Sequence, residues 1–507
     1  MSVKPNFLEL NLRSNKNLKS QSIVESRIAE KDSDIVKIIA VGSNASIIGS
    51  ETVAGEVRYS GRTIFNLVYE NSEGKTIRSE YGIEFSHKAE REDILPSMAA
   101  EVYIKTENTE LKQLNGSFVL SSIASADIIL AGTNKYNYLN SGEGIVFKSE
   151  DSLLLKSLGI TKGSYDLFDE LESVSFNDIL IHSESIVLTD VQSGVGCIIC
   201  DGAVNLNIVY TTGDEEIKIG NITKLVDFRF EVECEEAMPN MKVSAAAFIK
   251  SSNINANVDN SKDTSAIQAE VSIEVVGELF EETTLSCVSD LYSLTNEINI
   301  SAECIKNERP LKSKLFNEKV VDTAICGSEI NFSSDIEGIT QENLSIQTTN
   351  IKDGKFTAEG VVTALALTKT TDGKLGSVSL ELPFTLDLEL ESITDKSRIV
   401  LSGMAHSIYA RQKKEGEIEM EASLKIYARA FDYDYLTIIS DIEEGDEILQ
   451  KSSAISVFIP EKNDELWDVA KRLKESPENI LIYNSELEFP LKGEERIVIY
   501  RQQKIDY

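Results

Sequence analysis

The sequence predicts a mainly β protein in which three tandem sandwich- or barrel-like repeats precede a small strand–helix–helix–strand module. Three observations indicate this fold class. A glycine-containing strand pattern recurs three times, apolar and polar side chains alternate along many short segments, and the periodicity becomes helical near the C-terminus. The chain has 507 residues, and a domain typically takes about 150 residues, so several domains are expected.

The recurring pattern is a ten-residue strand in which a glycine stands eight positions before the last residue. It occurs at 60–69, 201–210 and 359–368, and the first two copies end in Leu67-Val68-Tyr69 and Ile208-Val209-Tyr210. A polar turn follows each copy, at 70–75, 211–216 and 369–374. An Asp-Ile pair precedes each copy at a similar distance: Asp34-Ile35, Asp178-Ile179 and Asp335-Ile336.

Further anchors link the first two copies, and their spacing changes slowly, as loop insertions on a shared scaffold would produce. Pro96 parallels Pro239, and Ile104-Lys105 parallels Ile249-Lys250. The third copy is more divergent. We therefore expect β-rich repeats at residues 1–145, 146–305 (with a preceding linker) and 306–445, followed by a separate module at 446–507.

Strict alternation supports the strand assignment within these repeats. From Ser379 to Leu390 every second residue is apolar, which indicates a strand with one buried face. Between repeats, the pattern predicts polar connections at 132–176 and 288–315, with a helix around Tyr165–Leu171 in the first of them.

The last fifty residues predict a strand, two helices and a strand. Ile455–Pro460 reads as a short strand, and Leu466, Val469, Ala470 and Leu473 then form one apolar helix face. Asn463 or Asp464 is expected to cap this helix. Ser476-Pro477 starts a second helix, with Ser as the cap and Pro in the first turn, and Ile497–Tyr500 is the closing strand.

The sequence does not indicate catalytic chemistry. The six cysteines and three histidines are scattered, without a complete set of metal ligands. No phosphate-binding glycine loop and no nucleophile elbow are present in the sequence. We expect no enzyme activity, no cofactor and no metal.

The net charge of −34 argues against two classes of partner. Nucleic acids and anionic membrane faces both attract clustered Lys and Arg, which this chain lacks. No apolar run reaches the roughly 18 residues that a membrane span needs, and the first residues lack the apolar core of a signal peptide. The expected location is therefore cytoplasmic. The excess charge keeps exposed strand faces soluble.

The C-terminal pattern resembles a LysM module over residues 454–502. LysM modules usually carry Gly-Asp-Thr where this chain has Asn463-Asp464-Glu465, and this departure disfavours binding of N-acetylglucosamine polymers. The resemblance implies that a partner or a glycan binds at the loops. The implied residues are Asn463, Asp464, Glu465 and Asn484, with Leu466 and Trp467 shaping the module. Trp467, the only Trp, either fills the small core or stacks on a sugar ring.

The repeats resemble the spore-coat-associated (SPOCS) domain, through the Asp-Ile opening, the Gly strand and the Ile/Leu-Val-Tyr strand end. Asp290-Leu-Tyr-Ser293 is similar to an element that this family places between repeats. Tandem SPOCS-like domains ending in LysM are the arrangement of clostridial spore-coat morphogenetic proteins. The resemblance implies a scaffold in the mother-cell cytoplasm, at the forespore surface, that binds the coat morphogenetic ATPase through LysM. The alternative is a wall or cortex protein that binds peptidoglycan or a chitin-type glycan.

Overall fold

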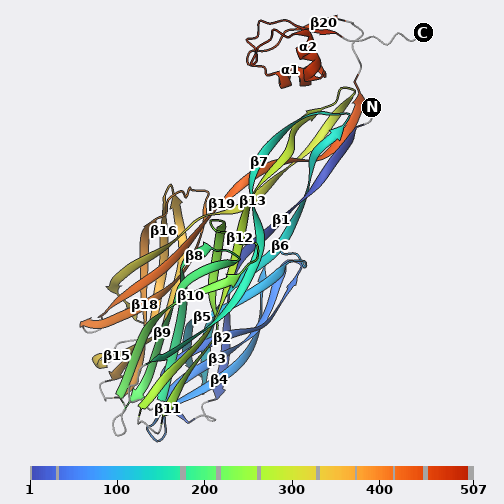
Figure 1. Ribbon diagram of the computed structural model, residues 1–507. Coiled ribbons are helices and arrows are strands. Elements are labelled where there is room, and N and C mark those ends of the chain that lie inside the picture. The colour runs from blue at the N-terminus through green and yellow to red at the C-terminus, as the bar shows by residue number, and fades with distance from the viewer. Residues whose placement is uncertain are drawn as a thin grey trace.

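The computed structural model describes residues 3–29, 34–171, 178–212, 218–259, 264–326, 332–370, 374–414, 417–448 and 455–500. Over these residues the protein is mainly β, and every pair of neighbouring strands is antiparallel. The molecule is elongated: lobes built of strands lie at one end, a narrow stalk leads away from them, and a small module with the helices sits beyond the stalk (Figure 1).

Three units whose six main strands pair in the same way follow one another along the described chain, and the third has one additional short strand. The first pairs strands in the orders β1-β6-β5 and β2-β3-β4, the second in the orders β7-β12-β11 and β10-β9-β8, and the third in the orders β13-β19-β18 and β14-β17-β16-β15. The strands of the first unit are β1 (Lys4–Ala29), β2 (Ile35–Val53), β3 (Glu56–Asn71), β4 (Thr76–Glu90), β5 (Ala99–Leu114) and β6 (Ser117–Glu143). Those of the second are β7 (Val146–Leu171), β8 (Asp178–Ser193), β9 (Cys197–Thr212), β10 (Lys218–Glu233), β11 (Lys242–Asp259) and β12 (Thr264–Tyr292). Those of the third are β13 (Asn296–Thr323), β14 (Ile325–Cys326), β15 (Phe332–Lys352), β16 (Lys355–Thr370), β17 (Leu375–Glu389), β18 (Arg398–Lys414) and β19 (Glu417–Glu447).

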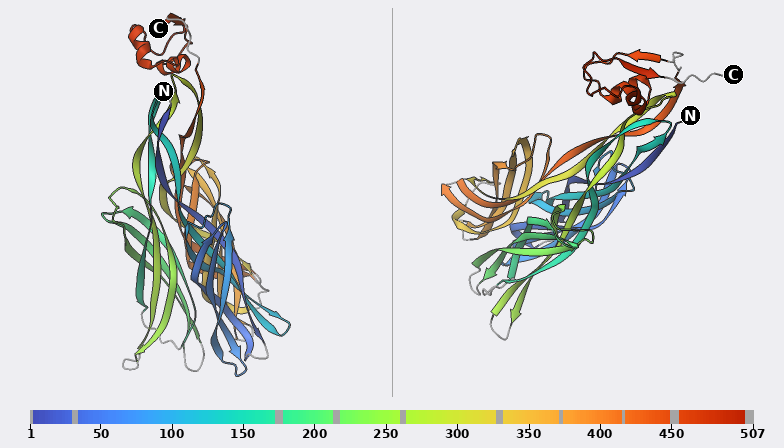
Figure 2. Two further views of the ribbon diagram at one scale, coloured as in Figure 1. Left: turned by 90° about the vertical axis from the view of Figure 1, so that its right-hand side faces the viewer. Right: turned by 45° about the horizontal axis from the view of Figure 1, so that its top comes forward.

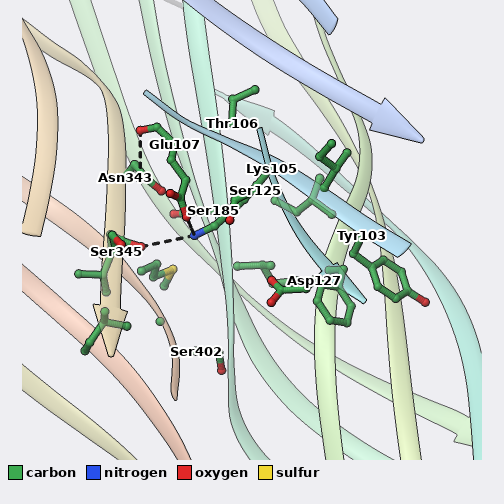
Figure 3. A pocket seen from close by; sticks show the side chains of 18 of the residues that line it. Tyr103, Lys105, Thr106, Glu107, Ser125, Asp127, Ser185, Asn343, Ser345 and Ser402 are labelled. Carbon is green, nitrogen blue, oxygen red and sulfur yellow. Dashed lines mark hydrogen bonds and ion pairs between the residues drawn. The ribbon is translucent and has the colours of Figure 1, made fainter. Parts of the chain in front are cut away.

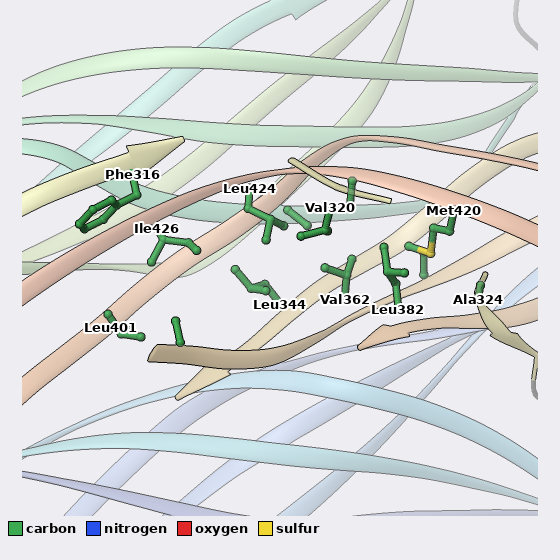
Figure 4. Close-up of a cluster of buried hydrophobic side chains, with 14 of the residues drawn as sticks. Phe316, Val320, Ala324, Leu344, Val362, Leu382, Leu401, Met420, Leu424 and Ile426 are labelled. Atoms are coloured by element: carbon green, nitrogen blue, oxygen red, sulfur yellow. The ribbon is translucent and has the colours of Figure 1, made fainter. Parts of the chain in front are cut away.

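Each unit buries apolar side chains between its two sheets. In the third unit, Phe316 and Leu424 from one sheet meet Val362 and Leu382 from the other (Figure 4). The alternation along β17 produces this face, because residues two apart point to the same side of a strand. Buried residues of β17 include Val378, Leu380 and Leu382.

The first and last strands of every unit are unusually long and leave the lobes together. The pairs β1–β6, β7–β12 and β13–β19 twist around one another to form the stalk (Figure 2). Their inward side chains form a shared core, which draws on Leu12, Leu154, Leu285, Ile305 and Ile438. The stalk therefore ties the three units into one body.

The lobes also meet one another in a closed ring. Arg78 of the first unit donates to the carbonyl oxygen of Ile179 (3.2 Å), and Asn221 of the second donates to that of Ile339 (3.1 Å). Lys374 of the third unit closes the ring on Glu70 of the first (2.6 Å). At the centre, one apolar cluster takes residues from all three units, including Val68, Val209 and Leu367.

The two connections expected between repeats are wrong, because the described parts of both segments, 132–171 and 288–315, lie mostly in stalk strands. Tyr165–Leu171 is the end of β7 and not a helix. Its apolar residues Tyr165, Leu167 and Leu171 fit a period of two, and the strand pairs with β12 along this stretch. Residues 288–315 likewise lie mostly in β12 and β13, and the boundary that we place between 305 and 306 falls inside β13.

The glycine strands of the repeats are β3, β9 and β16. The polar turn after β3 is held by Asn71, whose side-chain oxygen accepts from the backbone N–H groups of Glu73 and Lys75. The turns expected at 211–216 and 369–374 fall partly at 213–217 and 371–373, which lie outside the described residues.

The C-terminal module has the order β20 (Ile455–Phe458), α1 (Leu466–Leu473), α2 (Pro477–Tyr483) and β21 (Ile497–Tyr500), with β20 paired to β21. Ser476 caps α2 as expected, accepting from the N–H of Asn479 (3.2 Å). The cap expected for α1 at Asn463 or Asp464 is wrong. Glu465 is the N-cap and forms a capping box with Asp468.

Candidate partner-docking site

The loop before α1 holds three of the six residues that the sequence marks as candidates for partner or glycan binding, and the next two begin the helix. Asn463 has a φ of +71°, in the left-handed region that favours Gly or Asn. Its N–H donates to the carbonyl oxygen of Leu491 (2.7 Å), and the N–H of Leu491 donates to that of Asp464 (2.9 Å). The loop after β20 is thus joined directly to the loop before β21.

Asp464 is a structural residue of this loop. Its side chain is buried, accepts from Arg472 Nη2 (2.6 Å) and accepts from the N–H of Glu461 (2.7 Å). The pairing with Arg472 explains why Asp464 does not cap α1, because its carboxylate faces the last turn of that helix. Glu465 is exposed at the loop surface, while Leu466 packs against the module core.

Asn484 lies away from that loop and joins α2 to β21. Its Nδ2 donates to the carbonyl oxygens of Ile480 and Val498, both at 2.8 Å, and its Oδ1 accepts from the N–H of Val498 (2.8 Å). The side-chain amide is therefore committed to contacts within the module.

Trp467 turns toward the stalk. Its ring packs with the module core and makes an edge-on contact with Tyr292, at 5.3 Å between ring centroids. Its Nε1 donates to Oδ2 of Asp290 (2.8 Å), and Lys471, one helical turn further along α1, contacts Oδ1 of the same carboxylate (2.5 Å). The Trp and the Asp-Leu-Tyr-Ser element, both noted in the sequence, thus lie together.

An exposed apolar strip on the module is the feature that the sequence analysis missed. We define it as Ile455, Val457, Ile459, Tyr483 and Tyr500, which are each about half exposed or more. Ile455 and Tyr500 lie opposite each other on β20 and β21, and the Tyr483 and Tyr500 rings are 4.8 Å apart. Contiguous exposed apolar residues of this kind are typical of interaction sites. Alternation along Ile455–Ile459, beside the inward Phe458, is the signal that could have revealed it.

A cavity of about 1730 Å³ lies between the three lobes. The edge strands β2 and β5, β8 and β11, and β15 and β18 line it. Lys105 reaches across it toward the carbonyl oxygen of Leu344 (3.5 Å) and also pairs with Glu107 of its own strand (3.7 Å) (Figure 3). Asn343 of the third unit donates to the carbonyl oxygen of Glu107 in the first (3.1 Å).

The other two unit boundaries at this cavity each contain a carboxylate. Tyr103 donates to Glu274 across the first boundary (2.5 Å). Across the second, Ser183 and Asn207 both donate to Glu342 (2.7 and 2.6 Å). Burial raises the pKa of Glu342 to about 7, despite these hydrogen bonds. Hydrogen bonds therefore connect the three lobes around this cavity.

The second unit carries the family signature. Residues 177–259 match the family model described as SipL, SPOCS domain. The chain contains a SPOCS domain. The match covers β8, β9, β10 and β11, while β7 and β12, which complete the second unit, lie outside it. The SPOCS domain thus contributes Ser183 and Asn207, which donate hydrogen bonds to Glu342 of the third unit. No curated protein and no solved structure matches the chain.

The described parts of the chain lack a metal-binding cluster and a membrane-spanning helix. No group of His, Cys, Asp or Glu side chains there is arranged to hold a metal ion. Neither α1 nor α2 is long and apolar enough to cross a membrane.

Proposed function

We propose that this chain is a non-enzymatic scaffold of spore-coat assembly, whose C-terminal module docks a coat morphogenetic partner. The SPOCS match at 177–259 supports the link to sporulation. In this proposal the first and third units are further SPOCS-like domains, and residues 446–507 are a LysM module. The chain would act in the mother-cell cytoplasm, at the forespore surface.

The relationship among the units supports the tandem arrangement. All three pair their six main strands in the same way, and the third adds only the short strand β14. In each, the repeat glycine faces a Phe across the next strand: Gly61 faces Phe85, Gly202 faces Phe228, and Gly360 faces Phe384. The shared pair extends the likeness from the matched segment to the other two units.

The LysM assignment is supported by the backbone at Asn463. LysM modules usually carry Gly at this position, and Asn463 adopts a left-handed φ of +71°, which Gly reaches at least cost. The strand, two helices and strand follow in the order of that family.

The apolar strip is the observation that carries the docking role. Val457 is 58 % exposed and Ile459 is 67 % exposed on this small module. Burying such a surface against an apolar partner surface lowers the free energy of the complex. The expected partner is the coat morphogenetic ATPase.

The test is binding of the purified coat ATPase to the intact chain. Val457→Glu places a charge inside the strip without touching the module core, and it should weaken binding by roughly a hundredfold, as a hot-spot loss does. Glu486→Lys, at an exposed position outside the strip, is the matched control and should bind as the unsubstituted chain does. Equal binding by Val457→Glu and the unsubstituted chain would refute the docking role.

Glycan binding is the second candidate, favoured by the Tyr483 and Tyr500 ring pair, because exposed aromatic faces suit sugar rings. Sedimentation with purified peptidoglycan tests it. Asn463→Gly with Glu465→Thr should increase pelleting, and Tyr483→Ala with Tyr500→Ala should abolish it. A chain that stays in the supernatant in every case would eliminate this function.

A further inference from the structure

The contact between the module and the stalk is built from several independent interactions at the end of β12. Asp290 accepts from Trp467 and contacts Lys471, and its Oδ1 also accepts from the N–H of Leu291 (2.9 Å), which fixes the carboxylate. Tyr292 is 1 % exposed and donates to the carbonyl oxygen of Glu475 (2.6 Å).

Tyr292 belongs to the module core as much as to the stalk. Its ring clusters with Val469, Ala470 and Ile480 of the module. A buried aromatic side chain removes a large apolar area from water, so separating the two parts would expose it. Lys474 adds an ion pair to Glu297 of β13 (3.1 Å), beside the end of α1.

These contacts use one face of the module only. Trp467 and Lys471 are four residues apart on α1, so they share a helix face, and Lys474 and Glu475 follow directly. The strands β20 and β21, which carry Ile455, Val457 and Tyr500 of the apolar strip, lie on the side away from the stalk (Figures 1 and 2). The contact therefore leaves the strip exposed.

The carboxylate of Asp290 at this contact stays ionised at neutral pH. Burial alone would raise the pKa of Asp290, but the ion pair with Lys471 and the hydrogen bond from Trp467 outweigh it and hold that pKa below its ordinary value. The carboxylate is thus ionised and fully paired.

We propose that Asp290 and Tyr292 are positioning residues that latch the C-terminal module onto the stalk, so that the chain presents the apolar strip at its far end as part of one rigid body. The alternative is a C-terminal module that moves independently of the stalk. The consequence of the latch for partner docking rests on the proposed function, but the latch itself does not.

Trp467 allows a direct test, because it is the only Trp in the chain. Time-resolved fluorescence anisotropy of the intact protein should show Trp467 tumbling with the whole 56.1 kDa particle. Asp290→Ala with Tyr292→Phe should shift the emission to the red, shorten the correlation time and raise iodide quenching. Each lost hydrogen bond to a charged group favours opening by roughly tenfold or more.

A second variant and a control keep this test decisive. Lys471→Met removes the ion pair from the module side and should loosen the latch in the same direction. Asp446→Asn, an exposed acidic position on β19, should leave the spectrum unchanged. Circular dichroism of each variant checks that the lobes remain folded.

The latch is overturned if Trp467 of the unsubstituted chain already tumbles independently, or if Asp290→Ala with Tyr292→Phe leaves emission, quenching and correlation time unchanged. Partner binding distinguishes this from failure of the proposed function. Loss of the latch with intact ATPase binding removes only the latch, whereas equal ATPase binding by Val457→Glu removes only the docking role.

Discussion

Gly202 lies opposite Phe228 across the β9–β10 ladder, and a methyl group at Gly202 would stand 2.3 Å from the ring atom Cζ. The Phe ring therefore covers the glycine. The same relationship holds at Gly61 with Phe85 and at Gly360 with Phe384, where the methyl would stand 2.4 and 2.6 Å from the ring. The repeat glycine is thus required for packing: it provides room for an aromatic side chain from the next strand.

Substituting this glycine should destabilise its unit. In Gly202→Ala the new methyl would also stand 2.9 Å from the carbonyl oxygen of Val187, so both ring and backbone must shift. Overpacking of this kind costs about 1–3 kcal/mol. Urea unfolding followed by circular dichroism should show an earlier transition, and Phe228→Leu in the same chain should restore part of the loss.

Gly49→Ala is the matched control, because a methyl there meets no atom within 4 Å and the backbone is not left-handed. Its stability should stay within about 0.5 kcal/mol of the unsubstituted chain, or rise slightly through a stiffer unfolded state. If both substitutions shift the transition equally, the ring does not explain the glycine.

Because of Glu342, the free energy of unfolding should fall as the pH rises. Its carboxyl titrates near 4.5 when unfolded and about 7 when folded. The folded chain therefore binds the extra proton between these values, and the stabilisation present below pH 4.5 is lost by about pH 7. A shift of this size corresponds to about 3 kcal/mol. Glu184 and His182 lie nearby, paired at 2.6 Å.

Glu342→Gln keeps an uncharged group of the same shape beside Ser183 and Asn207. We expect a melting temperature above that of the unsubstituted chain at pH 8 and a smaller difference at pH 5. Glu337→Gln, on the same strand, tests for a general charge effect. A gain that is equal at both pH values would contradict the assignment.

Tyr103 should couple the first unit to the second. Tyr103→Phe keeps the ring stacked on Phe248, at 3.9 Å between centroids, but removes the hydrogen bond to Glu274. The buried acceptor then loses one of its partners, Lys250 remaining at 2.9 Å, at a cost of about 1–3 kcal/mol.

A double-mutant cycle with Glu274→Gln measures this coupling by urea unfolding. The exposed Tyr409→Phe is the control. Additive effects of Tyr103→Phe and Glu274→Gln would show that the two side chains do not interact in solution.

The local sequence pattern predicts where the strands are, but it does not predict which other strands pack against them. The sequence predicts strands that end in Leu67-Val68-Tyr69 and Ile208-Val209-Tyr210, and both segments lie in strands, β3 and β9. Leu67 and Ile208 pack within their own units, while Val68 and Val209 pack between units. The second face is buried by a different lobe, and no periodicity within one strand identifies that lobe.

The stalk and the latch escape sequence reasoning for related reasons. Segments at 132–176 and 288–315 look like connections because the stalk strands have polar outer faces and small shared cores. Trp467 and Asp290 are each conspicuous in the sequence, but they are far apart along the chain. Composition around either residue contains no information about the other, so their contact appears only in the fold.

Asn484 should be the residue on which the fold of the module depends most. Asn484→Ala removes hydrogen bonds to the carbonyl oxygens of Ile480 and Val498 and from the N–H of Val498, leaving partly buried backbone groups without partners. Each unsatisfied buried group costs about 1–3 kcal/mol, which is large for a module of this size. Trp467 emission against urea should therefore report module unfolding at a lower concentration, while circular dichroism of the lobes stays unchanged. Asn479→Ala, at the exposed surface of α2, is the control and should leave the Trp467 transition in place. If the two variants unfold together with the unsubstituted chain, the amide of Asn484 does not hold α2 to β21, and its place among the partner-binding candidates becomes the better explanation.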